Sequence, residues 1–108
     1  MSRALQVDFA SFQGEVLNAA QPVIVNFWAA SCAPCHTLTP ILEEIGGELG
    51  AYLKIVRVNV DENPALAEQY HVESLPTLIY FANGFVHDQT VGLPRKEEII
   101  SKIRSLPR

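Results

Sequence analysis

Two cysteines, Cys32 and Cys35, are the residues of this chain whose type and spacing most directly allow chemistry. They are the only cysteines among the 108 residues, and Ala33 and Pro34 separate them. The pair follows an apolar run over 22–28 and opens a helical pattern. Residues three apart on a helix share one face, with Cβ atoms about 5–6 Å apart, a spacing that a disulfide can bridge with small adjustment. The pair is therefore predicted to cycle between dithiol and disulfide.

The two cysteines are not equivalent in this arrangement. Cys32 lies at the exposed end of the predicted helix, where free N–H groups and the helix dipole favour a thiolate, so it is the candidate nucleophile. Cys35 lies one turn deeper and is the candidate resolving cysteine, which attacks the sulfur of Cys32 in a mixed disulfide and releases the substrate. Pro34 suits the first helical turn, because its missing N–H would lack an intrahelical partner there anyway.

Two metal-centred interpretations of the same cysteines compete with redox exchange. Zinc would need about two further ligands, and the histidines at 36, 71 and 87 are not arranged as a second paired knuckle. The run 32–36 also fits the CxxCH pattern of covalent haem attachment. Against haem, Met1 is the only methionine and no export leader is visible. Redox exchange is favoured, no metal or bound cofactor is expected, and His71 and His87 are assigned no role.

The composition bounds the function classes that the chain can serve. The formal net charge is −4 and no cluster of Lys and Arg stands out, so nucleic-acid binding is not expected. No apolar run approaches the ~20 residues of a membrane helix, and the N-terminal residues lack the apolar stretch of a secretory leader. A chain of 108 residues can bury a core without staples. We expect one cytoplasmic domain over residues 1–108.

The hydrophobic pattern predicts an α/β fold with the element order βαβαβαββα. Strands are predicted near 5–7 and over 23–27, 53–60, 77–81 and 85–91. Helices are predicted from a cap at Asp8 or Ser11 to about residue 19, from near 32 to the glycines at 46–50, from the capping residues 61–64 to about 70, and after 92–94. Pro40 is expected to kink the second helix. The turn 82–84 predicts a hairpin. The first part of the order argues for parallel strands with helices on both faces, and the hairpin adds antiparallel pairing.

Several short motifs together resemble the thioredoxin family over nearly the whole chain. They are Val25-Asn26-Phe27-Trp28-Ala29, Cys32-Ala33-Pro34-Cys35, Pro40, Asn59-Val60-Asp61, Leu75-Pro76-Thr77, Asn83-Gly84 and Gly92. A lone CxxC is a weak signal, whereas a CxxC after a strand that ends in tryptophan, followed by Leu-Pro-Thr, is a strong one. The resemblance implies a central mixed β-sheet flanked by helices on both faces. It also implies a cis peptide bond before Pro76, facing the cysteines.

The resemblance further implies which residues meet a substrate. The implied substrate-facing residues are Trp28, Ala33, Pro34, Leu75, Pro76, Gly92 and Leu93. Trp28 is equally compatible with plain core packing. Ala33 replaces the glycine that is commonest in the family and should stiffen the loop slightly. Ser31 replaces a usual aromatic residue and is a good helix N-cap.

Asn26 is the departure from the family that bears most on mechanism. The family usually has a buried Asp here, beneath the cysteines, which is thought to take the proton from the resolving cysteine. Asn is nearly isosteric but cannot titrate near neutral pH. One hypothesis is that resolution by Cys35 is slower here, or relies on water or His36; the other is that Asn26 only satisfies buried hydrogen bonds. Arg57 stands where Lys is common, and its planar fork could hydrogen-bond Asn26.

The sequence thus predicts a thiol-disulfide oxidoreductase that reduces protein disulfides through Cys32 and Cys35. The electrons travel on the cysteine pair, and thioredoxin reductase is the partner that the family implies. We expect a monomer that acts on proteins with exposed disulfides, without nucleic acid or membrane. The rival function is a thioredoxin-fold binding or assembly module with weak or no redox turnover, because Asn26, Ser31 and Ala33 depart from the family pattern.

Overall fold

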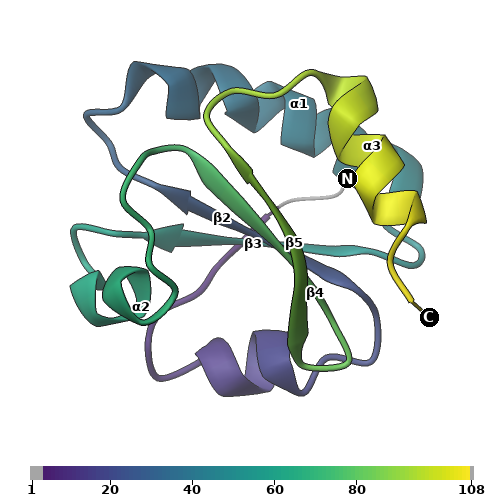
Figure 1. The fold of residues 1–108 in the computed structure, drawn as a ribbon, viewed down its shortest axis with the longest axis horizontal. Coiled ribbons are helices and arrows are strands. Elements are labelled where there is room, and N and C mark those ends of the chain that lie inside the picture. Colours follow the sequence, from purple (N-terminus) through teal and green to yellow (C-terminus); the bar gives the residue numbers. More distant parts are fainter. Residues whose placement is uncertain (1–3, 108) are drawn as a thin grey trace.

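A five-stranded sheet with helices on both faces organises the chain in the computed structural model, which describes residues 4–107 (Figure 1). The elements are β1 (Leu5–Gln6), η1 (Gln13–Leu17), β2 (Val23–Trp28), α1 (Ala33–Leu49), β3 (Lys54–Asn59), α2 (Pro64–Gln69), β4 (Thr77–Ala82), β5 (Phe85–Val91) and α3 (Lys96–Arg104). The order of elements agrees with the predicted βαβαβαββα.

The sheet has the strand order β1-β3-β2-β4-β5 and is mixed. β1, β3 and β2 run parallel, and β4 and β5 add antiparallel pairs. Phe27 near the end of β2 lies opposite Thr77 at the start of β4, and Thr77 lies opposite Val91 at the end of β5. One edge of the sheet therefore gathers the residues that follow β2, precede β4 and follow β5.

Side chains of β2 alternate between two hydrophobic cores. Val23, Val25 and Phe27 face the core under η1 and α2, and Ile24 faces the core under α1 and α3. Figure 1 shows α1 and α3 together on one side of the sheet, with α2 and η1 on the other. Because strand residues two apart share a face, Asn26 follows Ile24 onto the side of α1.

Helix α1 is the longest element and carries the cysteine motif at its start. Leu38, Leu42 and Ile45 are buried at helical spacing, so one face of α1 packs on the sheet. The helix continues through Gly46 and Gly47 to Leu49, and Gly50, the last of the glycines that were expected to close it, is its C-cap residue. Each internal glycine costs about 1 kcal/mol relative to alanine, which the packing of this face outweighs.

The N-terminal helix is much shorter than predicted. In place of a helix from a cap at Asp8 or Ser11 to about residue 19, the structure has a five-residue π-helix, η1, in which the Asn18 N–H donates to the Gln13 carbonyl at 2.9 Å. The Ser11 N–H donates to Asp8 Oδ1 at 2.9 Å, and the Asp8 N–H donates to Ser11 Oγ at 3.1 Å. These bonds close a separate turn around residues 8–11, so the helix starts later.

The β4–β5 hairpin is closed as its sequence predicts. Asn83 and Gly84 both have positive φ, +55° and +82°, as a two-residue type I′ turn requires. Gly84 also lies where a Cβ atom would come within 2.9 Å of the Leu17 carbonyl oxygen. Over residues 4–107, no helix combines the length and apolar character needed to cross a membrane.

Candidate active site

Cys32 and Cys35 are joined by a disulfide at the N-terminus of α1. Cys32 occupies the N-cap position with extended backbone angles, and the two Cα atoms are 5.3 Å apart. Cys32 is half-buried, whereas Cys35 has no exposed surface. An incoming molecule can therefore reach only the sulfur of Cys32.

The backbone around Cys32 favours a negative charge on its sulfur. The Cys35 N–H donates to Cys32 Sγ at 3.1 Å. The first turn of α1 carries no carboxylate, and its 17 residues place the positive end of the dipole at this sulfur. Ser31 does not cap the helix as expected, because the N-cap position falls one residue later. A thiolate at Cys32 thus receives a hydrogen bond and a favourable dipole.

The segment 74–76 and Gly92 lie at the same edge of the sheet as the cysteines. The Leu75–Pro76 peptide bond is cis, as the family resemblance implied. The Gly92 N–H donates to the Pro76 carbonyl at 2.9 Å, and Thr77 Oγ1 donates to the Ser74 carbonyl at 2.6 Å. The first bond links the segment before β4 to the residue that follows β5, and the second closes the turn at the start of β4.

The residues of this edge offer a mixed, partly accessible surface. Ala33 and Pro34 are exposed, Trp28, Leu75 and Gly92 are half-buried, Pro76 is buried, and Leu93 is 49% exposed. A groove of about 500 Å³ continues from Leu75 between α2 and the segment 71–75 that follows it. It is lined by Val60, Pro64, Ala67, Glu68, His71, Val72, Glu73 and Leu75. The surface therefore extends from the exposed turn of α1 toward α2.

Trp28 is covered by a cation from the neighbouring strand. The Arg57 guanidinium carbon lies 4.1 Å from the centre of the Trp28 ring, and the His36 ring meets Trp28 edge-on at 6.4 Å between centroids. Burial lowers the pKa of Arg57, and the charge of Glu43 partly offsets that effect. Arg57 thus stacks on Trp28 and makes no hydrogen bond to Asn26, the contact that its planar fork suggested.

Asn26 is fully buried, and its amide is unpaired. It lies opposite Arg57 on β3 and Leu78 on β4. Within residues 4–107, neither Asn26 Nδ2 nor Asn26 Oδ1 has a hydrogen-bond partner. The hypothesis that Asn26 only satisfies buried hydrogen bonds is therefore wrong, as far as its partners would be protein groups within residues 4–107.

The three histidines do not assemble a metal site. His36 is exposed and its Nε2 lies 2.7 Å from the Ala30 carbonyl oxygen, an acceptor, so this nitrogen carries a hydrogen. His71 follows the C-cap of α2 in a left-handed conformation with φ +58°, and His87 lies exposed on β5. Among the described residues, no group of three or more His, Cys, Asp or Glu side chains could hold a metal ion.

Two residues of α1 that sequence reasoning passed over also belong to this region. Thr39 Oγ1 donates to the Cys35 carbonyl at 3.2 Å, and Thr39 and Glu43 line a cavity with Asn26 and Arg57. The positions of Thr39 and Glu43, four and eight residues after Cys35, are the signal that could have found them, since such positions share a helix face.

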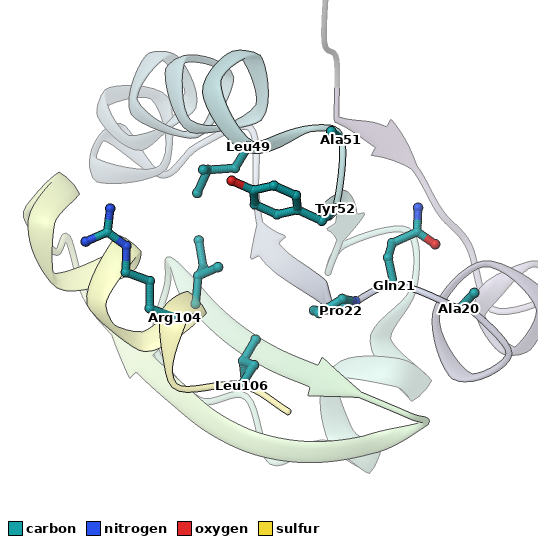
Figure 2. A pocket seen from close by; sticks show the side chains of 9 residues that line it. Ala20, Gln21, Pro22, Leu49, Ala51, Tyr52, Arg104 and Leu106 are labelled. Atoms are coloured by element: carbon teal, nitrogen blue, oxygen red, sulfur yellow. The ribbon is translucent and has the colours of Figure 1, made fainter. Parts of the chain in front are cut away.

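A second cavity of about 490 Å³ lies far from the cysteines (Figure 2). Leu49 and Tyr52 point into it from the end of α1 and the following turn, with Arg104 and Leu106 across from them. The 17 residues of α1 span about 25 Å, so this cavity and the cysteines lie at opposite ends of that helix. It belongs to a different part of the molecule from the redox pair.

An accessible sulfur bonded to a buried one, at a helix N-terminus beside the cis-proline segment 74–76, defines a dithiol-disulfide exchange site. The thioredoxin family model matches residues 3–105. A thioredoxin of Rickettsia bellii (strain RML369-C) is 43% identical over 102 residues, which cover 94% of this chain and 97% of that protein. Thioredoxin 1 of Nostoc sp. is 45% identical over 92 residues, covering 85% and 86% respectively.

The chain belongs to the thioredoxin family. It is a protein-disulfide oxidoreductase with a mixed α/β fold, and its redox centre is the Cys32–Cys35 pair itself, without a separate cofactor. Members of this family act on protein disulfides. A binding module without redox turnover is not favoured.

Proposed function

We propose that Cys32 is the attacking nucleophile and Cys35 the resolving cysteine of a dithiol that reduces disulfides in other proteins. The observation that carries this assignment is the difference in exposure, with Cys32 half-buried and Cys35 fully buried. The hydrogen bond from the Cys35 N–H to Cys32 Sγ supports the same roles, because it favours the Cys32 thiolate.

The reaction transfers two electrons in two exchange steps. The Cys32 thiolate bonds to one sulfur of the substrate disulfide, whose S–S bond breaks and whose second sulfur leaves as a thiolate. Cys35 then loses its proton and bonds to Cys32 Sγ, and the first substrate sulfur leaves in turn. The substrate ends as a dithiol and the protein as the Cys32–Cys35 disulfide.

The substrate-facing surface in this proposal comprises Trp28, Ala33, Pro34, Leu75, Pro76, Gly92 and Leu93. Their position at one sheet edge, and the groove of about 500 Å³ beside Leu75, support an extended peptide as the bound form. Such a peptide binds largely through backbone hydrogen bonds, so one surface can accept many sequences.

The partners follow from the family. We propose that thioredoxin reductase returns electrons to the disulfide, and that the protein works in the cytoplasm as a single-domain monomer over residues 1–108. The net charge of −4 supports protein partners over nucleic acid or membrane surfaces.

An insulin-reduction assay with dithiothreitol tests the proposal. The wild-type protein should accelerate insulin precipitation over the thiol background, Cys32→Ser should abolish the acceleration, and Cys35→Ser should accumulate mixed disulfides with substrate. No acceleration by the wild type would instead favour the binding module.

The equilibrium with glutathione tests the direction of electron flow. We expect a reduction potential of about −270 mV, as for a reductant, and a value of about −120 mV would make the protein an oxidant.

A further inference from the structure

A cavity of about 180 Å³ lies between α1 and the sheet, beside the redox helix. It is lined by Ala4, Asn26, Thr39, Leu42, Glu43 and Arg57. Asn26 has no exposed surface, whereas Glu43 is exposed on α1. The cavity therefore connects the protein interior beneath the helix with the surface, and its volume suits several water molecules.

Three polar atoms around this cavity have no protein partner. Asn26 Nδ2, Asn26 Oδ1 and Arg57 Nε are buried and make no hydrogen bond within residues 4–107. A buried polar group without a partner costs about 1–3 kcal/mol, so a cavity without water would destabilise the folded state. Water can bond to these atoms, because the cavity is both polar and large enough.

The charged groups that face the cavity come from two elements. α1 contributes Glu43, and β3 contributes Arg57, whose charge interacts with that of Glu43. β2 contributes Asn26, which does not titrate, and Ala4 precedes β1. Glu43 is thus the single carboxylate among the described residues that line the cavity.

Cys35 is connected to this cavity through its own helix. It lies one turn before Thr39, whose hydroxyl donates to the Cys35 carbonyl at 3.2 Å. Cys35 and Asn26 are both fully buried and both lie between α1 and the sheet, since buried α1 residues and alternate β2 residues face that layer. The thiol that must lose a proton and the polar cavity therefore share one layer.

We infer that this cavity is a hydrated proton path from Cys35 to the surface, and that Glu43 is its proton acceptor. The inference rests on the proposed function, in which Cys35 attacks the mixed disulfide. As the Cys35 sulfur bonds to Cys32 Sγ and the substrate sulfur leaves, the Cys35 proton passes to cavity water and on to the Glu43 carboxylate, which releases it to solvent. Asn26 orients the water. Glu43 acts through water, so it is a positioning residue rather than a catalytic one.

Stopped-flow reaction of the reduced protein with excess aromatic disulfide separates the two exchange steps. The first release of coloured thiol reports attack by Cys32, and the second reports resolution by Cys35. Glu43→Gln should slow the second phase roughly tenfold and leave the first phase unchanged. It should also change the pH profile of the second phase, measured between about pH 5 and about pH 9. The expected loss is below the 10²–10⁴ typical of direct general-base removal, because water stays in the path.

Glu48→Gln is the matched control, since Glu48 is also exposed on α1 but pairs with Lys96 at 2.7 Å, away from the cavity. It should leave both phases at their wild-type rates. In an Asn26→Asp background, which places a carboxylate inside, Glu43→Gln should change the second phase by less than about twofold. Wild-type second-phase rates and pH dependence in Glu43→Gln would overturn the inference. If instead Cys35→Ser kept the second phase, the proposed function itself would fail.

Discussion

Asn26 is the residue whose surroundings bear most directly on the mechanism of this site. The amide is fully buried without a described partner, and Arg57, its neighbour on β3, stacks on Trp28. A buried thiol has a raised pKa, so Cys35 needs a route for its proton before it can attack. At the residue scale, the step that the surroundings of Asn26 affect is therefore the loss of the Cys35 proton, and not the exchange between sulfur atoms.

Asn26→Asp should introduce a titratable group beneath α1. Burial would raise the pKa of the new carboxyl above its ordinary range, which suits it to accept a proton near neutral pH. We expect resolution by Cys35 to accelerate by about tenfold near pH 7, with a new pH dependence. Single-turnover kinetics from about pH 6 to about pH 9 measure both. Profiles that match the wild type would show that residue 26 takes no part in deprotonation.

Arg57→Met should weaken the packing on Trp28 while keeping an apolar stem of similar length. The loss of the cation above the ring should cost about 0.5–2 kcal/mol of unfolding free energy. Urea unfolding can be followed through the fluorescence of Trp28, the only tryptophan. Arg57→Lys serves as the control and should retain part of the interaction. A larger loss in Arg57→Lys than in Arg57→Met would contradict the stacking account.

At the scale of elements, local sequence signals predicted the hairpin and the position of the cysteine helix. The strand 85–91 and the turn at Asn83 and Gly84 agree with the structure because turn chemistry and alternation are local. The helix α1 ends before Gly50, within the run of glycines that was expected to close it. The length of η1 was predicted wrongly, since the turn at residues 8–11 precedes it. Helix propensity alone does not locate such a turn.

Two glycines of these elements should respond to alanine with opposite signs. Gly84→Ala places a Cβ atom at positive φ and 2.9 Å from the Leu17 carbonyl oxygen, so it should lose about 1–3 kcal/mol. Gly47→Ala adds a methyl group to an exposed helical position with nothing within 4 Å, so it should gain about 0.5–1 kcal/mol. Urea midpoints measure both changes. Equal shifts would refute the difference in backbone conformation.

At the scale of the whole molecule, the site depends on contacts that no local pattern encodes. The cis bond and the edge that gathers Cys32, Pro76 and Gly92 agreed with the family resemblance. The Arg57–Trp28 stack and the cavity beside Asn26 could not be predicted, because they join residues on different strands and a helix. Which side chains of neighbouring strands meet is determined by the pairing register of those strands, and the local sequence pattern alone does not reveal that register.

Global stability should fall in alkali through Tyr80, which is buried and hydrogen-bonded to Thr90 at 3.1 Å. Burial raises the pKa of Tyr80 from 10.0 to about 12. The folded protein therefore holds this proton after the unfolded chain has lost it. Stability should be intact below about pH 10 and decline by up to about 1.4 kcal/mol per pH unit toward pH 12.

Urea unfolding of the wild type and Tyr80→Phe over this pH range measures the contribution. The variant should lose about 1 kcal/mol at neutral pH with its hydrogen bond, but its stability should depend less on pH in alkali. Tyr70→Phe is run beside it, because burial also raises the pKa of Tyr70. Parallel alkaline slopes in the wild type and Tyr80→Phe would exclude Tyr80 as the source.

The bond from the Gly92 N–H to the Pro76 carbonyl extends the β4–β5 ladder past its last paired residues, Thr77 and Val91. The residues that would receive a substrate are thus anchored to the sheet before anything binds. Their conformational entropy is lost during folding, so a partner peptide has little of it left to remove. In hydrogen–deuterium exchange, the Gly92 amide should consequently be protected like a strand amide, despite its place in a loop.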